Sequence, residues 1–577
     1  MKSIRGRLLR YAAEVLPRPL ERPWAAWMLS FGVLTSVLII AGQWLYPPSD
    51  YELQIKYEPK EWEMGWNCVM SLGYGLFCGY ILTLIMVALP KWLGRIWMTM
   101  CMLMAVVDAG IDAGCLGMLR RNYNRLFVEI MGATNPEEVR GFFATYFHID
   151  FVWLLLAALL VGAIAWVVGR TWMPRRVSAP AATASILGMM ACGVVLWSVG
   201  PAWLKGLSYK FESLNNDYLL PNVVAANPAL ERTRPADEAP ELLIVVFGES
   251  LSSTKCSLYG YEQPTQPMLE QRLNDSTLYV FGPGESVGFY TIMSFRYHMS
   301  TYDKEHPDKG AWNTEPNIIE VARKAGYSTQ WLSNQRKAGR FENIITRYAQ
   351  FADKAYFTNE ATLDLDENEP AKYDEELLPM IRQHMPPAGE KSMMMVHLMG
   401  NHPYYGDRYP KNFNHFSAKD YEKYPKNQRL KRRLYDNSVL YNDSIINEII
   451  KMTDGRKAMV LYFSDHGSDI YDSDPKYCGH GRTNKKSVSA CQKVPILMYV
   501  SPELREAAPQ LMERINSAGR HPEYNTTNII YTINDILGQR FADRPNGPSL
   551  LEEETDTERE KRLKAEAEAS SSASTSE

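Results

Sequence analysis

The sequence has little net charge. Of its 577 residues, 62 are lysine or arginine and 66 are aspartate or glutamate, which gives a formal net charge of −4. A nucleic-acid-binding protein usually carries a strongly basic domain, so this balance argues against nucleic acid as a partner. The low apolar content of a disordered chain is also missing, because 46% of the residues are hydrophobic, enough to build a large core.

Long apolar runs are almost absent after residue 206, whereas the first third of the chain is rich in them. A membrane-spanning helix needs about 20 predominantly apolar residues. Five segments meet or approach this length, which is too many to bury in a soluble domain of that size. We therefore predict a transmembrane domain over residues 1–205 with five α-helical spans, namely Trp24–Leu45, Trp66–Leu89, Ile96–Met118, Ile149–Val168 and Ala181–Leu204.

Basic residues are unevenly distributed around these spans. The arm before the first span, the 90–95 loop and the 169–180 loop carry most of them, and all three lie on one side of a five-span domain. The positive-inside rule makes that side cytoplasmic. We therefore expect a multi-pass protein of the bacterial inner membrane, with the N-terminus in the cytoplasm and everything after Leu204 in the periplasm.

Two acidic residues fall inside the third predicted span. Asp108 and Asp112 are four residues apart and so share one helix face. Acidic groups in a span usually face protein or water, so the pair indicates either a polar groove for a lipid head group or a helix end near the interface. The segment Arg120–Phe147 is expected to be amphipathic and to lie along the membrane surface.

Cysteine is scarce, with eight residues in the whole chain. Five fall in the predicted spans, where cysteine acts as a small apolar residue. Cys478 and Cys491 flank a loop rich in glycine, asparagine, lysine and serine, and in an oxidising compartment they could form a loop-closing disulfide. Cys256 would then be an odd thiol, and we expect it to be buried rather than reactive.

The sequence pattern changes after a polar linker over residues 206–240. Short apolar runs alternate with amphipathic stretches, which predicts an α/β domain with a mostly parallel central sheet over residues 241–550. Residues 551–577 are predicted to form a disordered charged tail. The expected strands are Glu241–Phe247, Ser328–Leu332, Ser392–Leu398, Ala458–Phe463 and Val494–Val500, and helices are expected at Glu315–Ala325 and Tyr435–Met452.

Polar side chains follow three of these strands directly. Glu249 comes after the first, His402 after the third, and Asp465 with His466 after the fourth. Ligands of open parallel sheets bind beyond the carboxyl ends of the strands, so these side chains are expected to meet at one edge. Carboxylate oxygens with imidazole nitrogens suit a divalent cation, and zinc is the natural choice outside the cell.

Four stretches carry a family resemblance. GESLSSTKCSLYGYEQPTQP (248–267), VHLMGNHPYYGDRYP (396–410), YDNSVLYNDSI (435–445) and LYFSDHGSDIYD (461–472) resemble the phosphoethanolamine transferases of Gram-negative inner membranes. These enzymes belong to the alkaline-phosphatase/sulfatase superfamily. The resemblance implies an alkaline-phosphatase-like α/β fold behind a five-helix anchor.

The resemblance also implies a threonine nucleophile. The matching stretch is SVGFYTIMSFRYHMS (286–300), in which Thr291 is the candidate and Ser286 and Ser294 are its rivals. Without the resemblance, Thr291 would be interpreted as an ordinary helix N-cap. The family's zinc ligands fall on Glu249, Thr291, Asp465 and His466, and a metal there would activate the hydroxyl of Thr291.

Further site residues follow from the same resemblance. His402 and His480 match family histidines that contact the donor phosphate or a second zinc ion, while His397 is either a site residue or a packed core histidine. Asn334 and Gln335 resemble the family's phosphate-contacting amide pair, and either Lys337 or Arg340 could supply a cation beside them.

The implied reaction transfers phosphoethanolamine in two steps. Thr291 attacks the phosphorus of phosphatidylethanolamine and releases diacylglycerol, and an acceptor hydroxyl then displaces Thr291, with His402 or His480 as candidate general acid or base. Donor and acceptor are both expected to be envelope lipids. A cluster of basic residues could meet an anionic acceptor or form a solvated helix face: Lys426, Arg429, Lys431, Arg432 and Arg433.

The sequence departs from part of the family. The 468–486 loop lacks the Glu-Ser/Leu-Gly-Glu pattern of the members that modify lipid A, and SLYGYEQPTQP is more similar to those acting on lipopolysaccharide core or glucan. This favours core or glucan over lipid A as the acceptor. The alternatives are a phosphoglycerol transferase and a non-enzymatic membrane scaffold. A true sulfatase would need Cys/Ser-x-Pro-x-Arg, which is missing near residue 291.

Overall fold

The computed structural model describes residues 61–119, 150–157, 223–302, 312–335, 344–358, 373–481, 485–518 and 524–552 except 545, together with single positions such as Lys337. These residues fall into two compact units. Helices α3 and α4 belong to the first, and nearly everything from residue 223 onward belongs to the second. Each unit is described by itself.

The first unit contains two long apolar helices. Helix α3 covers Glu61–Ala88, and α4 covers Lys91–Gly114 before a π-helical turn at Cys115–Leu119. Among the described residues, one helix, Lys91–Gly117, is long and apolar enough to cross a membrane. The predicted spans at Trp24–Leu45 and Ala181–Leu204 lie outside the described residues, as do most of Ile149–Val168 and the segment Arg120–Phe147.

Helix α4 has two contrasting faces. Its small residues Ala105, Ala109 and Ala113 recur every fourth position and are buried, and Asp112 is buried beside them. A stripe of small residues lets helix backbones approach closely. The opposite face exposes large apolar side chains, the arrangement expected of a surface in contact with lipid: Trp92, Ile96, Met100, Leu103, Met104, Val107 and Ile111.

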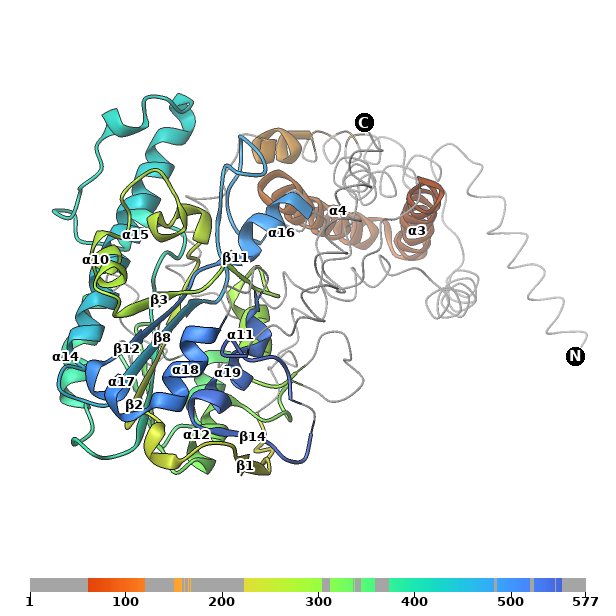
Figure 1. The fold of residues 1–577 in the computed structure, drawn as a ribbon. Coiled ribbons are helices and arrows are strands. Elements are labelled where there is room, and N and C mark those ends of the chain that lie inside the picture. The colour runs from red at the N-terminus through yellow and green to blue at the C-terminus, as the bar shows by residue number, and fades with distance from the viewer. Residues whose placement is uncertain are drawn as a thin grey trace, which may run out of the picture. The chain divides into compact units, whose positions relative to one another are not determined.

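A seven-stranded sheet forms the centre of the second unit, with helices on both sides (Figure 1). The strand order is β3-β12-β8-β2-β7-β5-β6, and β8, β2, β7, β5 and β6 run parallel. The five parallel strands are β8 (Ala458–Ser464), β2 (Leu242–Gly248), β7 (Ser392–His397), β5 (Ser328–Ser333) and β6 (Lys354–Phe357).

The predicted mostly parallel α/β sheet is confirmed, with one exception in direction. The run Val494–Val500 forms β11 (Lys493–Val494) and β12 (Ile496–Val500), and β12 is antiparallel to both β8 and β3 (Leu278–Val280). An apolar run does not reveal the direction of its strand. The strands β3 and β6 were not predicted, because each is short and partly exposed.

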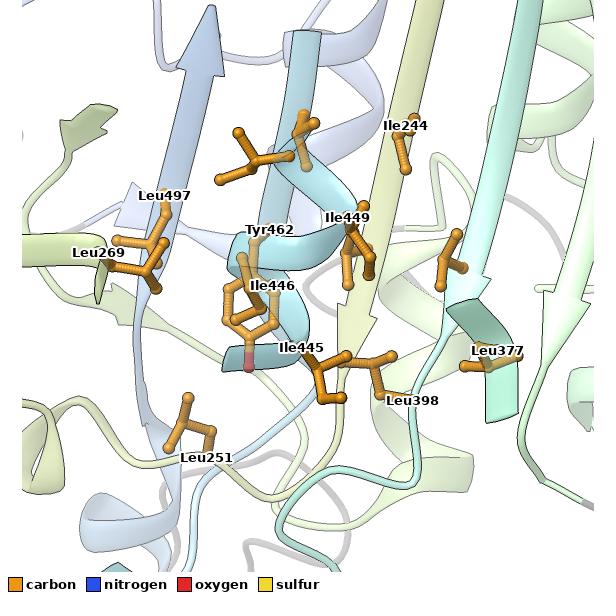
Figure 2. Packing of buried hydrophobic residues seen from close by; sticks show 14 of the residues in the cluster. Ile244, Leu251, Leu269, Leu377, Leu398, Ile445, Ile446, Ile449, Tyr462 and Leu497 are labelled. Carbon is orange, nitrogen blue, oxygen red and sulfur yellow. The ribbon is translucent and has the colours of Figure 1, made fainter. Parts of the chain in front are cut away.

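The aliphatic core lies on one face of the sheet. Helix α15 (Lys426–Lys451) packs there through Ile445, Ile446 and Ile449, with α10 (Pro267–Asn274) and α14 (Leu377–Gln383) beside it. Figure 2 shows these isoleucines against Ile244 of β2 and Tyr462 of β8. Truncating one such isoleucine to alanine typically costs about 2–5 kcal/mol, so this face supplies much of the stability.

The opposite face is aromatic. Phe295 of α11 (Thr291–His298) stacks on Phe247 of β2 with ring centroids 5.3 Å apart and meets the ring of His397 edge-on at 5.1 Å. These contacts fix α11 against the ends of β2 and β7. Helices α12 (Ile318–Lys324) and α19 (Ile529–Ile536) pack against each other in the same unit.

Two element boundaries differ from the sequence prediction. Strand β1 (Leu230–Arg232) lies inside the segment predicted as linker and pairs with β14 (Gln539–Phe541). Helix α15 begins at Lys426, nine residues before the predicted start at Tyr435, because its first turns are polar and carry no apolar periodicity.

The basic cluster at the start of α15 is only partly solvated. The guanidinium of Arg432 is buried over the Tyr424 ring at 4.4 Å, with the Tyr471 ring 5.3 Å away. Arg429 donates hydrogen bonds to the carbonyls of Tyr424 and Glu422. These two arginines hold the preceding loop, so the interpretation as a solvated face is wrong for Arg432.

The suggested disulfide between Cys478 and Cys491 is not formed in this structure. Both residues are buried free thiols. The Cys478 sulfur lies 4.0 Å from the Tyr405 hydroxyl, and the Cys491 sulfur lies 3.8 Å from the Gly479 carbonyl oxygen, so each thiol is directed at an oxygen. Cys256 is fully buried, as predicted.

Candidate metal centre and nucleophile

Strand register brings two carboxylates together at the carboxyl edge of the sheet. Gly248, the last residue of β2, pairs with Ser464, the last residue of β8. The next residues along the two strands are Glu249 and Asp465, so both must emerge side by side. Both are completely buried. Gly248 is required here because an added Cβ would lie 2.2 Å from the Tyr462 hydroxyl.

Four side chains converge at this edge. The Nε2 atom of His466 lies 3.4 Å from Glu249 Oε1 and 3.3 Å from Asp465 Oδ2. The Thr291 hydroxyl donates a hydrogen bond to Glu249 Oε2 at 3.0 Å and lies 3.4 Å from His466 Nε2. The structure therefore brings together the residues that the sequence predicted as metal ligands and nucleophile.

The electrostatics of the cluster favour a bound cation. Burial, reinforced by the charge of Asp465, raises the pKa of Glu249, and burial likewise raises the pKa of Asp465. Burial lowers the pKa of His466, so the imidazole is neutral and supplies no compensating charge. Two buried carboxylates without a counter-charge are costly, and a divalent cation would offset that cost.

The ligand atoms of the cluster are close enough together, and free enough of other hydrogen bonds, to bind a metal ion. One ligand atom each from Glu249, Asp465 and His466 can be chosen so that all three lie within 4.8 Å of one another. Asp465 Oδ2 is buried and accepts no hydrogen bond from the described residues. The Nδ1–H of His466 donates to the Gly467 carbonyl at 2.8 Å, which leaves the Nε2 lone pair facing the cluster.

Thr291 is the first residue of α11, as expected for a nucleophile at a helix N-terminus. Backbone N–H groups at such a terminus stabilise an anion. The rival hydroxyls are directed elsewhere, because Ser286 donates to the Asp465 carbonyl at 2.5 Å and Ser294 donates to the Tyr290 carbonyl at 3.1 Å. Thr291 alone among the three donates into the cluster.

The loop after β7 packs directly on Glu249. Gly400 has φ of +48°, and an added Cβ would lie 2.8 Å from the Glu249 carbonyl oxygen. The buried carboxylate of Asp374 accepts hydrogen bonds at 2.8 Å from the backbone N–H groups of Met399 and Gly400. Asp374 thereby fixes the turn that leads to His402.

Two further histidines lie close to the cluster. The His480 ring centroid is 4.5 Å from that of His466 and 6.0 Å from that of His402. Desolvation, with Arg408 and His466 adding to it, lowers the pKa of His402 to about 3. Desolvation, with His466 and His402 adding to it, holds the pKa of His480 well below its usual value. Both imidazoles are neutral near pH 7.

Of the predicted amide pair, Asn334 and Gln335, only Gln335 faces the cluster. The Gln335 side-chain nitrogen lies 3.5 Å from Glu249 Oε2, so Gln335 faces the cluster. Asn334 is turned away from it, because its amide donates to Asp374 at 2.8 Å and its oxygen accepts from Thr358 at 2.7 Å. Lys337 is exposed, and Arg340 lies outside the described residues.

His397 is packed in the aromatic face of the sheet. Its Nδ1 lies 3.1 Å from the Ser333 hydroxyl, and burial lowers its pKa to about 3. Of the two interpretations offered by the sequence, this geometry agrees with the core histidine.

Sequence reasoning missed Ser250 and Asp374. Ser250 forms hydrogen bonds with both carboxylates of the cluster. Asp374 lies in an acidic run that resembles the first turn of a helix, and no short-range pattern connects it with residues 399 and 400.

Similarity to known proteins assigns the chain to a family. The sulfatase family model matches residues 241–539, more than half of the chain. The chain belongs to the sulfatase family. Within that family it groups with the phosphoethanolamine transferases, as the sequence motifs predicted.

Two curated relatives illustrate this grouping. The phosphoethanolamine transferase EptC of Escherichia coli K12 is 25% identical over 455 residues, which cover 72% of this chain and 76% of the relative. The phosphoethanolamine transferase CptA of Salmonella typhimurium is 28% identical over 338 residues, which cover 57% of this chain and 56% of the relative.

Solved structures share the fold. The integral membrane lipooligosaccharide phosphoethanolamine transferase A of Neisseria meningitidis has a TM-score of 0.55 at 17% identity, covering 90% of this chain and 95% of that protein. The C-terminal periplasmic domain of E. coli EptC has a TM-score of 0.50 at 24% identity, covering 59% of this chain and 91% of that domain.

Proposed function

We propose that this protein is a zinc-dependent transferase that moves phosphoethanolamine from phosphatidylethanolamine to a cell-envelope glycolipid, with Thr291 as the covalent nucleophile. One observation carries the proposal. The Thr291 hydroxyl lies 3.0 Å from Glu249 and 3.4 Å from His466, within the cluster of buried carboxylates and imidazole that suits a metal ion. The chemistry named by its relatives agrees with this arrangement.

The metal ligands would be Glu249, Asp465 and His466, with Thr291 completing the set. Two carboxylates and one imidazole suit zinc, and the relative EptC of E. coli has been solved in complex with zinc. Bound zinc would supply the positive charge that lowers the pKa of a hydroxyl and neutralises a phosphate oxygen.

The first half-reaction forms a bond between Thr291 and phosphorus. The Thr291 hydroxyl donates its hydrogen bond to Glu249 Oε2, which orients the oxygen and gives its proton an acceptor. As the Thr291 oxygen attacks the phosphorus, the bond from phosphorus to the glycerol oxygen breaks. Diacylglycerol leaves with the proton that Glu249 received from Thr291, and phosphoethanolamine stays on Thr291. The N–H groups at the start of α11 face the developing phosphoryl charge.

The second half-reaction returns Thr291 to its starting state. An acceptor hydroxyl attacks the phosphorus and gives up its proton, the bond to the Thr291 oxygen breaks, and the Thr291 oxygen takes up a proton in exchange. His402 and His480 have lowered pKa values and are neutral near pH 7, so each presents a nitrogen lone pair to the site. The negative charge of a bound phosphoryl group would raise these pKa values, which would let either imidazole take the proton of the acceptor hydroxyl. Gln335 lies at the edge of the cluster, where its amide can donate to a phosphate oxygen.

The proposed lipid substrates explain why a membrane domain precedes the catalytic domain. The donor is a membrane lipid, so we propose that residues 1–205 anchor the enzyme in the bacterial inner membrane by five spans, N-terminus in the cytoplasm. Residues 206–240 would link this anchor to a periplasmic catalytic domain over 241–550, and 551–577 would form a tail. Among acceptors, the 248–267 and 468–486 stretches favour lipopolysaccharide core or glucan over lipid A.

Intact mass of the purified full-length protein tests the proposal. After exposure to phosphatidylethanolamine with zinc present, the wild-type protein is expected to gain the mass of phosphoethanolamine, and Thr291→Ala is expected to gain none. Thr291→Ser keeps a hydroxyl at the same place and serves as the matched control, with a slower but detectable adduct.

Two results would contradict the proposal. One is an unmodified wild-type protein without lipid turnover, and the other is an equal adduct on Thr291→Ala. Analysis of the released lipid separates the alternative donor, because a phosphoglycerol transferase would add phosphoglycerol from phosphatidylglycerol instead.

A further inference from the structure

The residue after Glu249 has an unusual backbone. Ser250 has φ of +59°, a left-handed conformation that is unfavourable for any residue with a Cβ and is usually taken by glycine. It is also completely buried. Such conformations persist where the surrounding structure over-determines them, and they cluster at functional sites.

In this conformation Ser250 holds one oxygen of each carboxylate. Its hydroxyl donates to Glu249 Oε1 at 2.7 Å, and its backbone N–H donates to Asp465 Oδ1 at 3.0 Å. The other two oxygens, Glu249 Oε2 and Asp465 Oδ2, are left for the centre of the cluster. Oε2 accepts the hydrogen bond of Thr291, and Oδ2 lies 3.3 Å from His466 Nε2.

The backbone carbonyl of Ser250 is held by a third contact. The buried Tyr435 hydroxyl of α15 donates to the Ser250 carbonyl at 2.8 Å and accepts from the Ser252 N–H at 3.0 Å. The Tyr435 hydroxyl thus forms hydrogen bonds with both ends of the turn that follows β2. The strained backbone is therefore supported by the helix that carries the aliphatic core.

Ser252 makes a comparable contact that avoids the ligands. Its hydroxyl donates to the Ser468 carbonyl at 2.8 Å and accepts from the Ser468 N–H at 2.9 Å. It therefore ties the loop after β2 to the loop after β8, as Ser250 does, but its hydroxyl bonds only backbone atoms of Ser468 and neither carboxylate.

We propose that Ser250 is a positioning residue that couples the two metal-binding carboxylates and aims their remaining oxygens at one point. Its hydroxyl orients Glu249, while its N–H, together with the His466 N–H at 2.6 Å, orients Asp465, so Ser250 links two ligands from different strands. This inference rests on the proposed metal site. A hydroxyl is needed as well as the left-handed backbone, which explains why glycine would not serve equally well.

Zinc affinity of the full-length protein in detergent tests the proposal, measured by competition with a chromogenic chelator. Ser250→Ala is expected to weaken zinc binding by about 10–100-fold, the usual cost of losing a group that orients a ligand. Ser250→Gly removes the strain of the left-handed backbone, but it also lacks the hydroxyl. It is therefore expected to weaken zinc binding to a similar extent, and its melting temperature should be no lower than that of Ser250→Ala. In both variants, the visible spectrum of bound cobalt is expected to shift.

Ser252→Ala is the matched control. It removes a hydroxyl that ties the same two loops, so its melting temperature is expected to fall while zinc affinity and the cobalt spectrum stay unchanged. Zinc affinity of Ser250→Ala and Ser250→Gly within twofold of wild type would overturn the role of Ser250. If Glu249→Gln also bound zinc like the wild type, the metal site itself would be wrong, and the two failures are thereby distinguished.

Discussion

Two groups of buried carboxylates in the α/β unit have opposite environments. Asp443 of α15 accepts backbone N–H bonds from Met268 at 2.9 Å and Leu269 at 3.0 Å, at the start of α10. Asp374 likewise has both oxygens bonded by the turn after β7. Glu249 and Asp465, by contrast, lie next to each other, and Asp465 Oδ2 accepts no hydrogen bond from the described residues.

The difference separates residues that hold the fold from residues prepared for a ligand. A buried carboxyl group whose two oxygens both meet backbone donors is a structural connection, because the hydrogen bonds offset part of its desolvation. Two buried carboxyl groups that lie next to each other, with Asp465 Oδ2 meeting no donor among the described residues, are unfavourable in the charged form until a cation binds. Substitutions in the adjacent pair are therefore expected to cost the metal-free protein less stability than substitutions of the carboxyl groups bonded by backbone N–H groups.

Glu249→Gln is expected to have the largest effect on activity and the smallest cost to the fold. Removing a ligand and its charge should lower phosphoethanolamine transfer by about 1000-fold or more, comparable to the loss of one strong electrostatic contact in a transition state. The metal-free variant should melt close to the metal-free wild type at pH 7, since burial raises the pKa of Glu249 to about 8 and the side chain is already largely uncharged there. Lipid turnover and melting curves with and without a chelator measure both.

A metal-free Glu249→Gln protein that melts well below the metal-free wild type would contradict the assignment of Glu249 to the metal site. It would place Glu249 with Asp443 and Asp374, as a carboxylate that the fold needs.

Asp443→Asn is expected to change stability in a pH-dependent way. Burial raises the pKa of Asp443 to about 7 in the folded protein, against about 3.9 in an unfolded chain. The stabilisation linked to this protonation is full below pH 4 and is lost as the pH rises through 7, by about 1.4 kcal/mol per pH unit. Asparagine does not titrate, so the variant lacks this pH dependence. The melting temperature of the wild type should therefore lie further above that of the variant at pH 5 than at pH 8.

The control for this variant is transfer activity. Turnover per folded molecule should be unchanged in Asp443→Asn at pH 8, because Asp443 caps α10 and does not belong to the metal cluster. An equal gap in melting temperature at pH 5 and pH 8 would contradict the assignment.

Gly400→Ala is expected to lower activity far less than Glu249→Gln does, with a modest loss of stability. The new Cβ would lie 2.8 Å from the Glu249 carbonyl oxygen, and φ of +48° is strained for alanine. We expect a loss of about 1–3 kcal/mol in stability and roughly a tenfold loss of activity. Gly406→Ala, whose Cβ would meet only the Leu434 side chain at 3.4 Å and beyond, is the control. Equal activity of the two variants would show that the 399–400 turn does not position Glu249.

The sequence was sufficient to predict the parts of the fold that depend on continuous patterns. The runs before Gly248 and Ser464 are apolar and uninterrupted, so their strands and the polar residues after them were visible. Thr291 was found through a family resemblance, because its own surroundings suggest only a helix start.

Other features depend on long-range register and were not predictable. Nothing near Asp374 indicates that it bonds the turn at Gly400, and nothing near Ser250 indicates a left-handed backbone. The direction of β12 depends on its pairing with β8, and its residues alone do not specify it. The start of α15 escaped prediction because its polar first turns pack through Arg432 on tyrosine rings.

Anomalous X-ray diffraction at the zinc edge, on crystals of the full-length protein grown with zinc, would show whether these side chains bind the metal. We expect an anomalous peak within about 2.0–2.2 Å of a carboxylate oxygen of both Glu249 and Asp465 and of His466 Nε2, with the Thr291 oxygen as the fourth ligand. A fully occupied zinc ion bound elsewhere, with these four side chains hydrogen-bonded only to one another, would contradict this expectation.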